Sequence, residues 1–281
     1  MEQLDPEDGL AIWDFTEGSE VPGGNLAVER LGVGVSSETW LVWNPGLWSP
    51  AVLKLPRPHE IRRRGPIQNL RRETAALAGN LHPGLPRLLS DGTSDPVPHI
   101  LTEYIDGPAL DEELDKNGAI GAEEAALLGA QLLPALASLH HRGLAHLDLK
   151  SANVVLRDGH PILLDFDAVA PIGTLQDPGH PVGTEGYCAP EQEACEPVTV
   201  AMDLYGLGMI LAEAVTGVPR AKAKIPPSPL APLIHQLRSK QPAERGTTGD
   251  ILVALADAAG ELLRPWPAWL NRYATDSQPV P

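Results

Sequence analysis

The chain has 281 residues and a formal net charge of −16. This length suits one large domain or two closely packed lobes, and the charge argues against nucleic acid or an anionic membrane as a partner. The acidic start has no signal-peptide core, no apolar run approaches the ~18 residues of a membrane span, and Cys188 and Cys195 form no disulfide framework. We therefore expect a cytoplasmic protein with no membrane span; no feature indicates an oligomeric state.

The first third of the chain predicts a small antiparallel sheet. Residues 26–43 alternate apolar and polar side chains on both sides of Gly32 and Gly34, which predicts two strands joined by a tight turn. A glycine pair of this kind also occurs in ordinary hairpin turns. Further strands are expected at residues 51–55, 84–92 and 98–107.

Helical periodicity dominates the remainder. A helix is expected over residues 67–81, with Leu81 on its apolar face, and a long one over residues 122–143, where Pro134 predicts a kink or local break. Shorter helical patterns cover residues 111–118, 203–216, 229–240 and 247–264. No helix is predicted between Gly217 and Pro227.

Lys54 and Glu73 are charged residues within apolar segments. Lys54 lies in the strand at residues 51–55 and Glu73 in the helix at residues 67–81. A buried lysine needs an anion, so Glu73 is its expected partner. The alternatives are an edge-strand lysine that reaches water and an ordinary surface glutamate.

Four polar residues suited to one chemistry lie close together in the middle of the chain: Asp148, Lys150, Asn153 and Asp165. The segment VVLRDGHPILL between the last two has a hairpin signature. Phosphoryl transfer needs a base that orients a hydroxyl, a cation for the moving phosphate and oxygen ligands for Mg²⁺. These residues could supply all three.

The spacing HxDxKxxN, followed by Asp-Phe, resembles the catalytic loop and metal-binding triplet of the protein kinase superfamily. The segment GTEGYCAPE at residues 183–191 resembles the family's GTxxYxAPE substrate-binding segment. The chain is thus similar to the bacterial, eukaryotic-like Ser/Thr protein kinases. The resemblance implies an α+β, two-lobed protein kinase fold, with an antiparallel N-lobe sheet plus one helix and a mainly helical C-lobe.

The resemblance covers a kinase domain at residues 26–264, divided into an N-lobe at about 26–105 and a C-lobe at about 106–264. An N-terminal arm at residues 1–25, in which Trp13 and Phe15 are expected to dock on the body, precedes it. A C-terminal tail at residues 265–281 follows.

By resemblance, ATP with Mg²⁺, or with Mn²⁺ in its place, is the expected cofactor, and a protein Ser or Thr hydroxyl is the expected acceptor. Asp148 and Lys150 would be catalytic, and Asn153 and Asp165 would hold the metal. The expected nucleotide-binding residues are Gly32, Gly34, Lys54, Glu73, Glu103 and Ile105. The resemblance also implies that Asp203 holds the catalytic loop from below and that Arg245 pairs with Glu191.

Two departures from the family pattern carry predictions. Leu147 occupies the position of the arginine that usually binds a phosphate on the activation loop, so activity is expected not to require phosphorylation of Thr174. Asp167 stands where the family has glycine. Its carboxylate could bind metal, or it could turn to solvent or cap a local N–H group.

Two other functions remain open from the sequence. Small-molecule phosphotransferases of the aminoglycoside or choline kinase type share HxDxxxxN but lack the GTxxYxAPE segment. A nucleotide-binding pseudokinase scaffold would bind partners without catalysis, although every transfer residue is present here.

Overall fold

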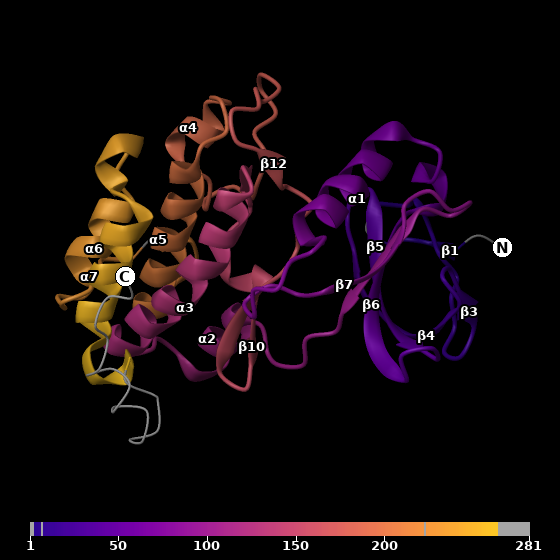
Figure 1. Ribbon diagram of the computed structural model, residues 1–281, viewed down its shortest axis with the longest axis horizontal. Coiled ribbons are helices and arrows are strands. Elements are labelled where there is room, and N and C mark those ends of the chain that lie inside the picture. The colour runs from indigo at the N-terminus through magenta and orange to yellow at the C-terminus, as the bar shows by residue number, and fades with distance from the viewer. Residues whose placement is uncertain (1–2, 7, 222, 264–281) are drawn as a thin grey trace, which may run out of the picture.

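The computed structural model describes residues 3–6, 8–221 and 223–263. These residues form two lobes, a strand-rich N-lobe with one α-helix and a helical C-lobe (Figure 1). The α+β, two-lobed fold expected from the sequence is confirmed. The predicted tail at residues 265–281 lies outside the described part of the chain.

The N-lobe is built on a six-stranded antiparallel sheet with the order β3-β4-β5-β6-β8-β7. Its strands are β3 (Glu20–Val21), β4 (Asn25–Val33), β5 (Ser37–Asn44), β6 (Ser49–Pro56), β7 (Leu88–Gly92) and β8 (His99–Glu103). Strand β3 lies within residues 1–25, the segment predicted to be an N-terminal arm. The sheet therefore begins before residue 26.

Strand β6 separates the two faces of this sheet. Leu53 and Leu55 are fully buried in an apolar cluster on one face, whereas Lys54 lines a cavity on the other. This follows from the alternation of side chains along a strand. Because β6 pairs with β5 on one side and β8 on the other, Lys54 is not on an edge strand.

The N-terminal arm packs on the apolar face of the sheet. It contains the short strand pair β1 (Gln3–Leu4) and β2 (Ala11–Ile12). Trp13 stacks on Phe15 with ring centroids 5.2 Å apart, and Phe15 contacts Trp40 edge-on at the same separation. The expected docking of Trp13 and Phe15 is therefore present.

Helix α1 (Arg64–Leu77) crosses the N-lobe after the 3₁₀ turn η1 (Pro58–Glu60). The prediction that the helix reaches Leu81 is wrong. Ala78 leaves helical geometry, Gly79 has φ +66°, and Leu81 is 93% exposed. Glycine adopts positive φ without steric cost, and a glycine in this conformation commonly ends an α-helix.

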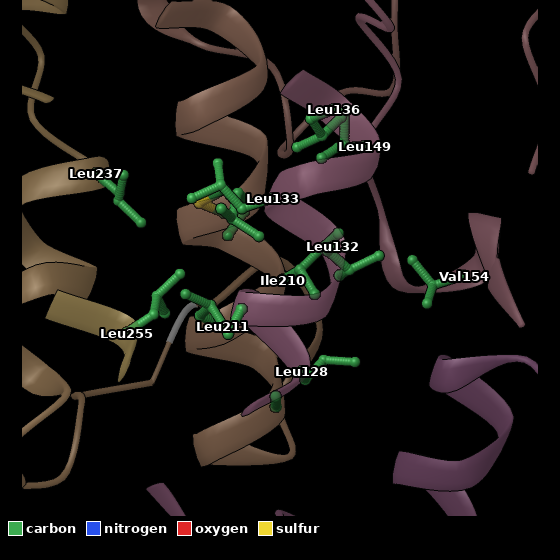
Figure 2. Close-up of a cluster of buried hydrophobic side chains, with 14 of the residues drawn as sticks. Leu128, Leu132, Leu133, Leu136, Leu149, Val154, Ile210, Leu211, Leu237 and Leu255 are labelled. Atoms are coloured by element: carbon green, nitrogen blue, oxygen red, sulfur yellow. The ribbon is translucent and has the colours of Figure 1, made fainter. Parts of the chain in front are cut away.

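The C-lobe is organised around two long helices, α3 (Ala122–His141) and α5 (Val200–Thr216), with leucine side chains between them (Figure 2). The other helices are α2 (Leu110–Asn117), α4 (Pro190–Glu193), α6 (Ala231–Leu237) and α7 (Thr248–Ala259). Short 3₁₀ turns are η2 (Ser151–Asn153), η3 (Pro219–Ala221), η4 (Pro242–Arg245) and η5 (Gly260–Leu263). Helix α3 runs through Pro134 without interruption, so the predicted local break is absent.

Two short strand pairs complete the C-lobe: β10 (Val154–Arg157) with β11 (His160–Leu163), and β9 (Leu144–Ala145) with β12 (Ala170–Pro171). The predicted hairpin turns at Asp158 and Gly159, which both have positive φ. Between α5 and α6, where no helix was predicted, the described residues form the 3₁₀ turn η3 but no α-helix. Among the described helices, none is long and apolar enough to cross a membrane.

Candidate active site

A cavity of about 590 Å³ lies between the lobes. Its walls include every residue for which the sequence predicts a nucleotide or metal role: Gly32, Gly34, Lys54, Glu73, Glu103, Ile105, Asn153 and Asp165. The elements that carry them are far apart in the chain, from the β4–β5 turn to the segment after β11. The fold alone brings them to one cavity.

The two glycines lie in the β4–β5 turn over the cavity. Neither Gly32 nor Gly34 has positive φ, and an added Cβ at Gly32 would meet no atom within 4 Å. Backbone strain therefore does not require glycine here. The absence of a side chain leaves room for a ligand to approach the backbone N–H groups closely.

Lys54 is surrounded by three carboxylates. Its Nζ lies 3.0 Å from Glu73 Oε2, 3.0 Å from Asp165 Oδ1 and 2.7 Å from Asp167 Oδ1. The predicted pair with Glu73 is present, and the lysine side chain is 10% exposed. Three carboxylates and one ammonium leave this corner of the cavity with a net charge of about −2 when all are ionised.

The pKa values of two of these carboxylates, Glu73 and Asp165, shift in opposite directions. Burial, together with the nearby Asp167 and Asp165 carboxylates, raises the pKa of Glu73 to about 7, although Lys54 opposes the shift. Burial also disfavours ionisation of Asp165, but the Lys54 ammonium outweighs it and places the pKa of Asp165 below its ordinary value. Lys54 thus holds Asp165 in the charged state, whereas Glu73 takes up a proton more readily than an ordinary glutamate.

The Asp167 side chain makes a contact that was not considered from the sequence. It does not simply turn to solvent or cap a local N–H group, because it forms the shortest of the three ion pairs with Lys54. Its side chain is 41% exposed, so part of the carboxylate also faces water. The sequence contained the signal, an aspartate in place of glycine, but not the lysine as its partner.

The residues expected to be catalytic, Asp148 and Lys150, form a second cluster beside the cavity with Thr184 and Asn153. Lys150 Nζ donates to Asp148 Oδ2 and to Thr184 Oγ1, both at 2.9 Å, and the Thr184 hydroxyl donates to Asp148 Oδ1 at 2.6 Å. Asn153 Nδ2 donates to the backbone carbonyl of Asp148 at 2.9 Å. Asp148 is therefore fixed on both of its carboxylate oxygens.

Asp203 supports this loop from α5, as the resemblance implied. Its buried carboxylate accepts the backbone N–H groups of His146 and Leu147, both at 2.8 Å. It also lies 2.7 Å from His140 Nε2. No spacing in the sequence connects His140 with Asp203, so this partner was missed. Burial opposes ionisation of Asp203, but the contacts with His140, His146 and Leu147 lower its pKa.

A buried glutamate on the same helix makes a second connection to the loop. Glu213 accepts hydrogen bonds from Ser151 Oγ at 2.9 Å and from Tyr187 OH at 2.7 Å. Burial raises the pKa of Glu213 and, with the Glu213 contact, raises the pKa of Tyr187 to about 12. The Tyr187 phenol therefore remains a neutral hydrogen-bond donor, which ties the GTEGYCAPE segment to the catalytic loop.

The side chain of Leu147 lies in an apolar cluster. Leu147 is 4% exposed and packs with Ala170, Val198 and other apolar residues, where the family pattern would place an arginine. Gln192 Nε2 donates to the carbonyl of Leu147 at 2.7 Å. Leu147 itself has φ +68°, an uncommon conformation for leucine.

Glu191 and Arg245 form the predicted ion pair. The guanidinium binds both carboxylate oxygens, at 2.5 and 2.7 Å, and the two side chains are 5% and 0% exposed. Arg245 also donates to the carbonyl of Ala201 at 2.7 Å and lies over the Tyr205 ring. These contacts join the GTEGYCAPE segment to α5 and to the end of the C-lobe.

The end of β8 and the residues that follow it line the cavity. Glu103 and Ile105 line it, as expected, together with Thr102. The Glu103 side chain points to cations instead of into the cavity: it pairs with Arg157 at 2.7 Å and Arg87 at 3.2 Å. Burial opposes ionisation of Glu103, but hydrogen bonds from Arg87 and Arg157 lower its pKa. Only its backbone could serve a nucleotide base.

The oxygen atoms of the site suit a hard divalent cation. Asn153 uses its amide nitrogen on Asp148 and leaves its Oδ1 for another partner, and Asp165 is a charged carboxylate with a 39% exposed side chain. The charge excess around Lys54 also favours a cation in this corner. Carboxylate and amide oxygens are the ligands that Mg²⁺ prefers, so the donor set fits the expected metal.

The sequence matches the protein kinase domain family over residues 27–252. The chain therefore belongs to this family. Among solved structures, it is similar to the PknI kinase domain of M. tuberculosis, with a TM-score of 0.68 and 25% identity over 88% of this chain and 99% of that one.

Curated relatives are bacterial proteins named as serine/threonine-protein kinases. The chain is 36% identical to PkaA of Streptomyces coelicolor over 66% of its length, and 30% identical to PknB of Mycolicibacterium smegmatis over 68%. It is 30% identical to the probable kinase PkwA of Thermomonospora curvata over 85% of its length. The matched regions span 35%, 32% and 34% of those proteins, respectively.

Proposed function

We propose that the protein transfers the γ-phosphate of ATP to Ser or Thr hydroxyls of protein substrates. The observation that carries this proposal is the Asp148–Lys150–Thr184 cluster beside the cavity that holds Lys54. The family membership and the names of the bacterial relatives support the same activity.

Each residue has a role that its contacts allow. Asp148 Oδ1 already accepts a hydrogen bond from the Thr184 hydroxyl at 2.6 Å, so the same carboxylate can orient a substrate hydroxyl and accept its proton. Lys150 lies beside it and would neutralise the transferred phosphate. Lys54, placed by Glu73, would bind the other phosphates.

Asn153 and Asp165 would hold Mg²⁺, or Mn²⁺, which when bound neutralises charge on the phosphates. The turn with Gly32 and Gly34 would cover those phosphates with backbone N–H groups. The backbone of Glu103 and Ile105 would contact the base.

The direct test is incubation of the pure protein with labelled ATP, Mg²⁺ and a peptide array containing Ser, Thr and Tyr acceptors. We expect label on Ser and Thr peptides, because Lys150 and Thr184 form the arrangement typical of Ser/Thr kinases beside Asp148. Label mainly on tyrosine would contradict the acceptor assignment. ATP binding without turnover would indicate a pseudokinase, and labelling of aminoglycosides or choline alone a small-molecule phosphotransferase.

Loop phosphorylation is expected to be unnecessary for activity. Thr174 is exposed, and the position that would supply a phosphate-binding guanidinium is the buried Leu147. Thr174→Ala, and protein treated with phosphatase, should therefore keep most of the parental kcat. Thr184→Ala, which removes a hydroxyl that contacts Asp148, provides the contrast and should lose activity. A loss of about two orders of magnitude in Thr174→Ala would contradict the prediction.

The Asp167–Lys54 ion pair is expected to weaken ATP binding when no divalent cation is present. Asp167 lies 2.7 Å from the ammonium that would bind phosphate, so the carboxylate competes for Lys54 and repels the ligand. Asp167→Asn should tighten metal-free ATP binding by about two- to fivefold, the range for a partly exposed ion pair. Isothermal titration calorimetry in EDTA measures this.

Asp106→Asn, a change at an exposed residue next to Ile105, is the control and should leave metal-free affinity unchanged. Equal affinities for Asp167→Asn and the parent would show that Asp167 does not compete for Lys54. Titration of activity with Mg²⁺ and Mn²⁺ in the same variant tests whether Asp167 also binds metal, in which case the half-maximal concentration rises.

A further inference from the structure

Arg57 is a buried cation just beyond the end of β6, three residues after Lys54. Its side chain is 1% exposed, and a buried guanidinium is stable only when its donors are paired. All of the partners described for this side chain lie in two places. One is the N-terminal arm, and the other is the glycine turn between β4 and β5.

The arm supplies the counter-charge. Arg57 binds both carboxylate oxygens of Asp8, at 2.5 and 2.9 Å, in the bidentate arrangement that gives the strongest charged hydrogen bonds. Arg57 also donates to the carbonyls of Leu10 at 3.1 Å and Ala11 at 3.3 Å. A further carboxylate, that of Asp5, lies 3.7 Å away.

The same arginine reaches the glycine turn. Its Nη1 donates to the carbonyl of Gly34 at 3.4 Å, and its backbone N–H donates to the carbonyl of Ser36 at 3.0 Å. Gly34 lines the cavity between the lobes. Arg57 therefore joins the arm directly to the segment that would cover the phosphates.

The arm also forms hydrogen bonds with β4 and β5, the two strands that flank this turn. The fully buried Glu38, on β5, accepts the backbone N–H of Trp13 at 2.8 Å. Arg30, on β4, donates to the carbonyl of Trp13 and pairs with Glu38 at 3.2 Å. Trp13 Nε1 donates to the carbonyl of Pro56, next to Arg57, at 2.8 Å. These contacts are separate from those of Asp8 and act on the same turn.

We propose that the N-terminal arm, through the Asp8–Arg57 pair, holds the Gly32–Ser37 turn in its nucleotide-binding position. Arg57 is then a positioning residue for ATP binding, and Asp8 is its counter-ion. The proposal rests on the function proposed above. Without the pair, the Gly34 carbonyl loses its contact with the guanidinium and the turn samples positions farther from the phosphates.

The test uses the full chain with Asp8→Asn, which removes the charge and keeps the side-chain shape. Asp14→Asn is the matched control, since Asp14 is an exposed aspartate of the same arm. Two properties are measured: amide hydrogen exchange over residues 33–37, and the Kd for MgATP by calorimetry. Thermal unfolding is followed in parallel to separate local from global effects.

We expect Asp8→Asn to speed exchange over residues 33–37 and to weaken MgATP binding by about three- to tenfold, as for loss of one partly exposed bidentate pair. Asp14→Asn should match the parent in both. The single variant Asp8→Glu keeps a carboxylate and should retain part of the affinity for MgATP that Asp8→Asn loses. Arg57→Lys keeps the positive charge but lacks the planar guanidinium that binds both carboxylate oxygens, so it should lose affinity as Asp8→Asn does. KM for ATP should rise while kcat at saturating ATP stays near the parental value.

Unchanged exchange and affinity in Asp8→Asn would overturn the proposal. So would exchange that rises equally throughout the N-lobe with a lower Tm, because the pair would then be only structural. If the parent binds MgATP but transfers no phosphate, the proposed catalytic function fails while both measurements still decide the role of the arm. If the parent binds no MgATP, the exchange measurement alone decides it.

Discussion

Asp148→Asn is expected to lower kcat by about 10²–10⁴-fold, the usual contribution of a positioned general base. The amide retains the shape of the side chain and can still contact Thr184 and Lys150, but it cannot accept the substrate proton. The variant should remain folded, because asparagine has nearly the same volume as aspartate and the side chains of this cluster are partly exposed. Steady-state kinetics with a Ser or Thr peptide, beside thermal unfolding, measure both effects.

Asp165→Asn should be similarly damaging for a different reason. The variant removes the charged carboxylate that pairs with Lys54 at 3.0 Å and would hold the metal. Loss of a metal ligand removes several kcal/mol of charge stabilisation. The side chain is 39% exposed, so the fold should tolerate the change.

Asp158→Asn is the control for both variants. Asp158 is exposed in the β10–β11 turn with φ +50°, a conformation that asparagine also adopts readily. Its kcat should equal that of the parent. Parental turnover in either Asp148→Asn or Asp165→Asn would show that the site is assigned to the wrong residues.

Arg245→Met is expected to give the largest loss of stability. The substitution leaves Glu191, which is 5% exposed, without its counter-charge in the interior. Removal of one partner from a buried pair costs about 3–5 kcal/mol in the free energy of unfolding. For a protein of this size the corresponding fall in Tm is about 6–20 °C, which differential scanning calorimetry detects.

Arg87→Met provides the surface comparison, because Arg87 pairs with Glu103 but its side chain is 69% exposed. An exposed pair contributes about 0–1 kcal/mol, so this variant should unfold near the parental temperature. The double variant Glu191→Gln/Arg245→Met removes the stranded charge and should recover part of the loss. Equal Tm values for Arg245→Met and Arg87→Met would contradict the account of the buried pair.

The sequence by itself determined the fold class and most of the proposed site. Motif spacing identified Asp148, Lys150, Asn153 and Asp165, because phosphoryl transfer restricts both residue type and order. Alternation and helical periodicity located the main strands and helices, since these patterns record which faces are buried. The departure at Leu147 was also visible in the sequence, as a missing cation.

The periodicity of the sequence did not predict where every helix ends or whether it is interrupted. Periodicity extended the first helix to Leu81, whereas the chain leaves helical geometry at Ala78 and Gly79. Helix α3 continues through Pro134 despite the missing N–H group. Its leucines bury an apolar face against α5 (Figure 2), and such packing outweighs a local propensity.

The partners of three other charged groups were decided by the tertiary structure alone. Asp167 pairs with Lys54, His140 with Asp203, and Arg57 with Asp8. In each pair the residues are far apart in the chain, and no spacing rule connects them. A buried or partly buried charge takes whichever opposite charge the fold brings within a few ångströms, and that choice depends on how the lobes and the arm pack in three dimensions.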